Sequence, residues 1–201
     1  MKTEKTITPL NGYLVVAMLL VLAALILYGF ISNNMILGVP SFVLFALLTK
    51  GFMIISPNSS KVLLLFGDYK GSVKQSGFLW INPLYNGTSL SLRARNFESE
   101  KIKVNDKMGN PILISVILVW KVKDTFKASF EVDNYENFIK IQTDSAVRKL
   151  AGSFPYDHFE DERATVTLST NFDDVNKALE HEVTQRLEIA GIEVVESRIG
   201  Y

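Results

Sequence analysis

Between Thr6 and Thr49 the chain runs for 44 residues without a single Asp, Glu, Lys or Arg. A protein of 201 residues has too little other polypeptide to surround so long an uncharged stretch in a soluble core. Polar residues 32–34, Ser-Asn-Asn, divide the stretch into two apolar blocks, and Asn readily adopts turn conformations. We therefore expect a helical hairpin in a membrane, rather than a buried hairpin in a soluble domain.

The first block, residues 13–31, has the length of a membrane-spanning helix. Its 19 residues rise roughly 28 Å as an α-helix, close to the hydrocarbon thickness of a bilayer. Tyr13 and Tyr28 lie near its ends, where Tyr is enriched in membrane helices. A cleaved signal peptide is the main alternative, because Lys2 and Lys5 precede the block. The block is longer than a usual signal core and no small-residue cleavage site follows it, which favours a membrane helix.

The second block, residues 35–49, is shorter and contains Gly38 and Pro40. As a helix it rises only about 22 Å, so it requires a locally thinner bilayer, a contribution from the next residues, or entry from one side only. The sequence leaves open whether the hairpin spans fully or is buried from one side. Basic residues flank the pair of blocks on both outer sides and are absent between them: Lys2, Lys5, Lys50 and Lys61. The positive-inside rule then places residues 1–12 and the polar domain in the cytoplasm, at the inner or plasma membrane.

Beyond Lys50 the pattern becomes that of a polar α+β domain. Residues 112–122 form the longest expected strand, and both of its faces are largely apolar, which predicts a central strand covered on both sides. The glycine-rich residues 67–77 are expected to link strands. Shorter strands are expected at 52–56, 61–66, 78–81, 88–94 and 102–104, with turns at 57–60 and 106–110.

Helical spacing of apolar residues appears in the second half of the chain. One helix is expected over 134–151, with Asp133 and Glu136 as a capping box and Gly152 at its end. A second is expected from about 173 to 190, followed by Gly191 and a last strand at 192–199. The buried stripe of the second helix is expected to comprise Val175, Leu179, Val183, Leu187 and Ala190. Strands early and helices late indicate the α+β class.

Nothing in the sequence predicts catalysis, a cofactor or a metal. The chain has no Cys, no nucleophile-elbow sequence and no glycine-rich phosphate loop. His158 lies in an acidic stretch, but its spacing fits no familiar set of His and carboxylate ligands, and a solvated surface explains the stretch better. Of 21 basic and 21 acidic residues, three and one lie in residues 1–50, so residues 51–201 carry a net charge of −2. This weakly acidic body argues against a nucleic-acid partner.

The segment Phe78, Leu79, Trp80 and Ile81 permits two interpretations. The favoured one is an ordinary core strand, because an apolar run of this length suits a strand. The other places the segment against the bilayer surface, where Trp is favoured, with Lys70 and Lys74 close to anionic lipid.

Several separated segments resemble the SPFH family, the band 7 proteins of the stomatin, prohibitin and flotillin type. They are PNSSKVLLLFGDYKGSVKQSGFLWINPLY at 57–85, SLRARNFESEKIKVNDKMGNPILISVILVWKVKDTFKASFEVDNYENFI at 91–139, FPYD at 154–157 and GIEVVESRI at 191–199. The resemblance covers residues 51–200 and implies an antiparallel sheet with packed helices. It implies a membrane-proximal part at about 51–104, which in this family commonly lies on the membrane, and a second part at about 105–201.

The resemblance also implies a function. Such proteins are membrane-anchored scaffolds that self-assemble into rings or cages, organise lateral membrane domains and often escort membrane proteases or channels. They usually continue past the terminal strand into a long helix that contributes to assembly, whereas the printed sequence stops at Tyr201. The chain is thus expected to be a short member or a piece of a longer one, whose self-association needs the membrane and such a helix.

Three functions can be compared on this basis. A scaffold would have the bilayer and further copies of itself as partners, and it is the expected function. A regulatory adaptor would bind one membrane protease or channel, and a hydrolase acting alone is the least expected. Purified protein assayed on peptide and ester substrates separates the last from the others.

Overall fold

The computed structural model describes residues 3–157 and 166–200, and its chain divides into two compact units. The first is Met1–Ser91 and the second is Leu92–Tyr201. The division lies between Ser91 and Leu92 rather than near residue 104, because the strands at 95–98 and 102–105 both pair with the long strand of the second unit.

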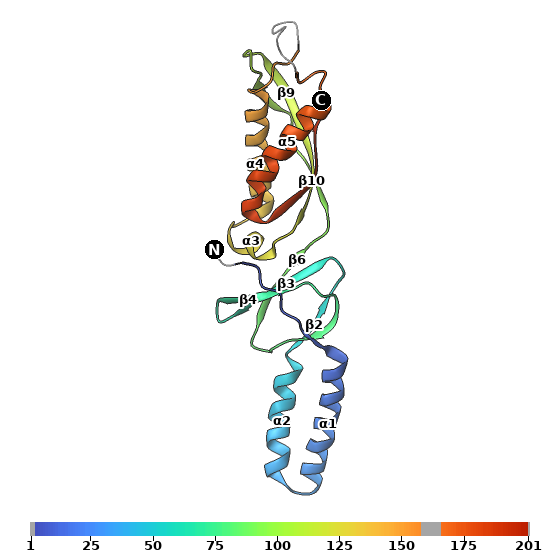
Figure 1. The fold of residues 1–201 in the computed structure, drawn as a ribbon. Coiled ribbons are helices and arrows are strands. Elements are labelled where there is room, and N and C mark those ends of the chain that lie inside the picture. Colours follow the sequence, from blue (N-terminus) through green and yellow to red (C-terminus); the bar gives the residue numbers. More distant parts are fainter. Residues whose placement is uncertain (1–2, 158–165, 201) are drawn as a thin grey trace. The chain divides into compact units, whose positions relative to one another are not determined.

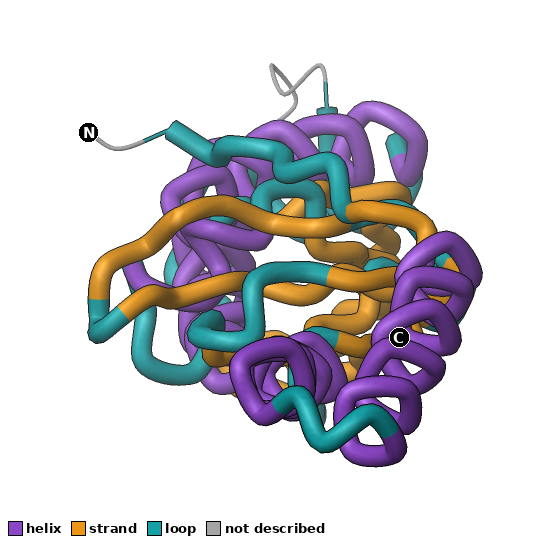
Figure 2. The backbone as a smooth tube through the Cα atoms, turned by 90° about the horizontal axis from the view of Figure 1, so that it is seen from below, coloured by secondary structure: helices purple, strands orange, loops and turns teal. Residues whose placement is uncertain are grey.

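The apolar tract forms the two expected helices, α1 (Gly12–Ile31) and α2 (Met35–Thr49). The Asn11 side chain accepts a hydrogen bond from the Tyr13 N–H and so caps α1. Asn33 takes a left-handed conformation (φ 54°) in the turn between the helices. Figure 2 shows the two helices side by side. Their backbones meet at Gly29 and Gly38, where a Cβ on Gly29 would lie 2.8 Å from the Gly38 Cα.

Two small antiparallel sheets complete the first unit. One has the order β1 (Leu10–Asn11), β5 (Gly77–Trp80), β2 (Phe52–Ile55). The other has the order β4 (Asp68–Val73), β3 (Ser59–Leu65), β6 (Asn86–Ser91). Their shared core consists of Met53, Ile55, Leu63, Val73, Leu79 and Ile81.

The segment before the helices is hydrogen-bonded to strands that come after them. The Ile7 N–H donates to the Ser72 carbonyl oxygen (3.0 Å), and the Ser72 N–H donates to the Lys5 carbonyl oxygen (2.7 Å). Leu10 and Asn11 pair with Trp80 and Leu79 in β5. The hairpin therefore leaves from and returns to the same small pair of sheets.

The second unit is one antiparallel sheet covered by helices. Strand β9 (Pro111–Val122) lies at its centre, between β10 (Ile192–Gly200) on one side and β7 (Arg95–Glu98) and β8 (Ile102–Asn105) on the other. Helices α3 (Thr125–Phe130), α4 (Tyr135–Ala151) and α5 (Phe172–Leu187) follow β9, and a short 3-10 turn, Glu188–Ala190, precedes β10. Figure 1 shows α4 and α5 against the sheet.

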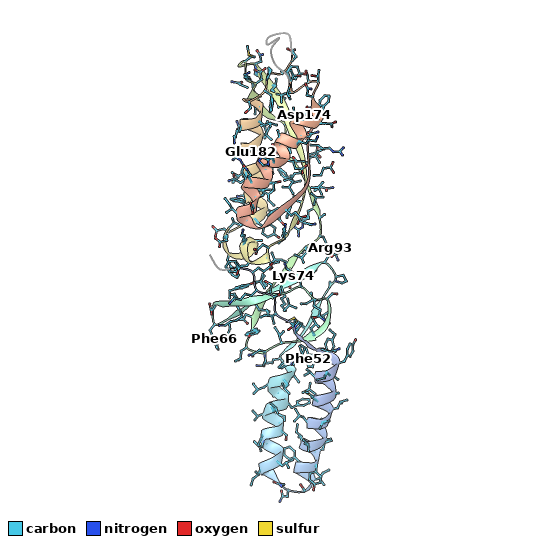
Figure 3. The ribbon with its side chains drawn as sticks, in the orientation of Figure 1. Phe52, Phe66, Lys74, Arg93, Asp174 and Glu182 are labelled. Carbon is cyan, nitrogen blue, oxygen red and sulfur yellow. The ribbon has the colours of Figure 1, made fainter. Side chains whose placement is uncertain are left out.

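Pairing between α4 and α5 is polar as well as apolar. The Glu182 carboxylate of α5 accepts hydrogen bonds from Lys149 of α4 and from Arg186, both at 2.7 Å. The hydrogen bond from Lys149 has the largest effect, and together with the one from Arg186 it holds the pKa of Glu182 below its usual value. Figure 3 labels Glu182 on the side of α5 that meets α4.

The long strand, the α5 stripe, the Gly191 stop and the last strand are confirmed. Val175, Leu179, Val183 and Leu187 are all buried, and Gly191 ends the 3-10 turn in a left-handed conformation (φ 67°). The α+β class is confirmed as well.

Other local predictions are wrong. Most of the expected linker 67–77 is strand β4, and the expected strand 88–94 ends at Ser91, with β7 as a separate strand. The short helix α3 is not predicted by the sequence pattern. Asn134, not Asp133, caps α4, because its side chain accepts the Asn137 N–H at 3.0 Å.

The prediction that β9 is covered on both faces is also wrong. Helices cover the face that carries Val116, Leu118 and Trp120, whereas Leu113 and Ile117 on the other face are 59% and 42% exposed. Among residues 3–157 and 166–200, the helices of the second unit thus cover one face of its sheet only.

Candidate membrane interface

The sheet β1-β5-β2 carries an apolar outer face, which we call the outer sheet face. The register places Leu10, Trp80 and Phe52 in one row, and Phe78 and Ile54 in the next. The alternate residues, among them Leu79 and Met53, point into the core. Leu10 is 54% exposed and Ile54 is 78% exposed. A small sheet normally presents polar residues to water, so this sheet is unusual in having apolar residues on both sides.

Aromatic side chains join the outer sheet face to the start of α1 and to the end of α2. Phe52 and Phe78 stack with their ring centroids 5.1 Å apart, and Tyr13 in the first turn of α1 lies edge-on to Phe78 at 5.3 Å. Trp80 Nε1 donates to the Leu48 carbonyl oxygen at 2.7 Å, which satisfies one of the terminal carbonyls of α2. Figure 3 shows Phe52 where the sheet meets the helices.

The two candidate lysines do not lie in this face. Lys70 is on β4 and pairs with Asp68 at 2.8 Å, and this hydrogen bond raises the pKa of the Lys70 ammonium. Lys74 follows β4 and pairs with Glu4 at 2.7 Å. In Figure 3 Lys74 is farther from the helices than Phe52 is. Contact of either lysine with lipid stays a prediction.

Alternate residues of the candidate segment 78–81 fit different interpretations. Leu79 and Ile81 lie in the core, as the core-strand interpretation expects, whereas Phe78 and Trp80 point outward beside the helices. Sequence reasoning missed Leu10, Phe52 and Ile54. The alternation of Phe52-Met53-Ile54-Ile55 could have revealed two of them, but a strand of two residues leaves no periodic signal at Leu10.

Within residues 3–157 and 166–200, no group of three His, Cys, Asp or Glu side chains could hold a metal ion. His158 lies outside the described residues. His181 is exposed on α5, and its Nε2 lies 3.1 Å from Gln185 Nε2.

Helix α1 is long and apolar enough to cross a membrane, while α2 is shorter. Only 11% of the most apolar 18-residue segment of α1 is buried, whereas a core helix of a soluble protein is mostly buried.

The sequence pattern of the SPFH domain / Band 7 family matches residues 53–200, nearly the whole of the chain beyond the helices. The chain belongs to this family. No curated protein matches it as a relative. SPFH proteins are in general membrane-associated scaffolds without catalysis. The SPFH domain here begins in β2, so the outer sheet face belongs partly to this domain and partly to the segment before α1.

Proposed function

We propose that this SPFH protein is a membrane-anchored scaffold that self-associates and organises lateral membrane domains or membrane protein complexes, with no catalysis of its own. The observation that carries the proposal is the outer sheet face, which is apolar, exposed at Leu10 and Ile54, and joined by Phe78 and Trp80 to the ends of both apolar helices. Such a face suits the bilayer rather than water.

The outer sheet face also supports a proposal about how deeply the first unit enters the bilayer. Helix α2 has 15 residues and rises about 22 Å, less than the roughly 30 Å of the hydrocarbon core. Strand β2 follows α2 almost directly and adds apolar surface through Phe52 and Ile54. In this proposal the sheet lies at the interface, and its aromatic residues occupy the headgroup level, where Trp and Tyr are enriched.

Lipid contact is tested with the two tryptophans of the chain. In Trp120→Phe the fluorescence comes from Trp80, and in Trp80→Phe it comes from Trp120, which is 4% exposed in the second unit. The full chain is placed in vesicles whose lipids carry bromine near the headgroup end of the acyl chains. We expect strong quenching of Trp80 and little of Trp120. Equal quenching of the two would overturn the proposed interface.

The pairing of Lys5–Ile7 and Leu10–Asn11 with strands that come after α2 supports a proposal about orientation. Both flanks of the hairpin then lie on one side, which we propose is the cytoplasmic side. Single Cys residues at Lys5, Asn33 and Lys61 in this Cys-free chain are probed on intact cells with an impermeant thiol reagent. Labelling at Lys61 without labelling at Lys5 would mean a single crossing; labelling at Asn33 alone would mean a full span, and protection of all three a hairpin buried from one side.

Affinity capture of the full chain from membranes tests the scaffold role. Recovery of many further copies with lipid supports a scaffold. One client protein at equal stoichiometry, without self-association, would instead identify an adaptor of a membrane protease or channel.

A further inference from the structure

The uncovered side of the second unit's sheet has an apolar centre, which we call the open sheet face. It consists of Leu113, Ile117 and Val119 along β9, with Val195 beside them at the irregularity of β10. Leu113 is 59%, Ile117 42% and Val195 50% exposed. Antiparallel sheets that face water usually carry polar residues there, so this stripe is more apolar than solvent requires.

Charged residues flank the stripe in an ordered way. At the level of Ile117 the neighbouring strands place Glu98 of β7 on one side and Arg198 of β10 on the other. At the level of Val119 they place Asn96 on the β7 side and Glu196 on the β10 side. Arg198 also contacts Glu196 along its own strand. The β7 side at Ile117 is thus acidic and the β10 side is basic.

This order makes the face complementary to itself. Rotating a second copy by 180° about the direction of β9 brings the two faces together, keeps each level opposite itself and exchanges the β7 and β10 sides. Ile117 then meets Ile117, Arg198 meets Glu98 of the second copy, and Glu196 meets Asn96. Facing sheets pack about 10 Å apart, a gap that Arg and Glu side chains can close.

We infer that the open sheet face binds a second copy of this chain, face to face, with the two-fold axis along β9. The inference rests on the self-association in the proposed function and assigns it a surface. A lipid headgroup surface fits this face less well, because its charged rim is balanced: Lys103, Lys121 and Arg198 against Glu98, Glu193 and Glu196. An isologous contact of this kind gives a closed pair.

The test uses two charge reversals that repel alone and attract together. Glu98→Arg places two arginines opposite each other in a pair of identical copies, and Arg198→Glu places two glutamates there. A mixture of the two variants restores both contacts. The new arginine of the first variant would meet the new glutamate of the second, and the unaltered Arg198 of the first would meet the unaltered Glu98 of the second. Full-length chains with two different tags are combined in mild detergent, and co-capture and sedimentation are measured.

We expect each reversal alone to weaken pairing about tenfold or more, and the mixture to pair about as well as the unaltered chain. Lys177→Glu and Glu180→Arg reverse charges of both signs on the exposed side of α5 and serve as matched controls without effect. Reversals that leave pairing unchanged, or a mixture that pairs no better than its components, overturn the face-to-face pair. Absence of co-capture for the unaltered chain would instead overturn self-association by residues 1–201.

Discussion

Asp106 is a buried carboxylate that ties two distant segments of the second unit together. It accepts hydrogen bonds from the N–H groups of Met108 (2.9 Å) and Asn110 (2.7 Å) in its own turn, and from the Tyr156 N–H (3.0 Å). The Lys107 N–H donates to the Phe154 carbonyl oxygen nearby. Burial alone would raise the pKa of Asp106, but the donors from Asn110 and Tyr156 together hold it below its usual value.

A pH-dependent stability follows from this lowered pKa. The folded state holds Asp106 ionised more strongly than the unfolded state does, so its contribution is complete above the unfolded pKa near 4 and is lost as pH falls through the lower folded value. Asp106→Asn replaces one of the two accepting oxygens by an NH₂ group, which then faces either the Tyr156 N–H or the N–H groups of Met108 and Asn110, and it should cost about 1–3 kcal/mol at pH 7. Denaturant unfolding between pH 3 and 7 checks this. An unchanged acid dependence in the variant would assign it to other carboxylates.

Trp120 is the largest aromatic anchor of the second unit. It is 4% exposed on the helix-covered face of β9, edge-on to Tyr135 with 5.9 Å between ring centroids, and Arg95 lies 5.7 Å from its ring. Trp120→Ala should lower the free energy of unfolding by about 3–5 kcal/mol through lost burial and a cavity. Trp120→Phe keeps a ring against Tyr135 and should cost clearly less. Thermal melting of both variants decides this, and a Trp120→Ala chain as stable as the original would contradict the packing.

At the scale of the element, the hairpin depends on a close approach that is not symmetric. A Cβ added to Gly29 would lie 2.8 Å from backbone atoms of Gly38, whereas a Cβ on Gly38 would lie 3.7 Å from the nearest atom of Gly29. Gly29→Ala should therefore force the helices apart, while Gly38→Ala fits in ordinary van der Waals contact. Melting in detergent, or a distance between spin labels on the two helices, should change for Gly29→Ala only. Equal effects of the two substitutions would contradict this asymmetric contact.

At the scale of the whole molecule, the two units differ in how far they depend on the chain's beginning. Within the described residues, the strands that pair in the sheet of β7–β10 all come from residues 95–200. The first unit instead uses residues before the helices, through Ile7 and β1. We expect residues 92–201 alone to unfold cooperatively, and residues 51–91 alone to lack stable structure. Circular dichroism and proteolysis of the two fragments measure this; a structured 51–91 fragment would mean that β1 is dispensable.

The sequence predicts what depends on local periodicity and misses what depends on distant contacts. The stripe of α5 and the length of β9 follow directly from spacing. The glycine in strand β4 favours a linker in the sequence. In the structure a Cβ at Gly71 would lie 2.7 Å from Ile7, a residue that comes before both helices in the chain. The outer sheet face can be predicted only in part. Trp80 is a candidate from the sequence, but its hydrogen bond to Leu48 and its pairing with Leu10 join segments that are distant in the chain and leave no local pattern.

The pairing of the early segment with later strands also constrains the order in which the first unit can fold during synthesis. Lys5 leaves the ribosome 64 residues before Tyr69, the residue whose hydroxyl accepts its N–H, and the whole hairpin is synthesised in between. In the proposed topology both helices enter the bilayer and return before the early segment meets its strand partners. A chain whose second helix failed to return would carry Leu10 and Trp80 to opposite sides of the membrane and leave β5 without β1. Under the proposed topology the sheet of β1, β5 and β2 closes only after the hairpin has returned, so its folding would report correct membrane insertion.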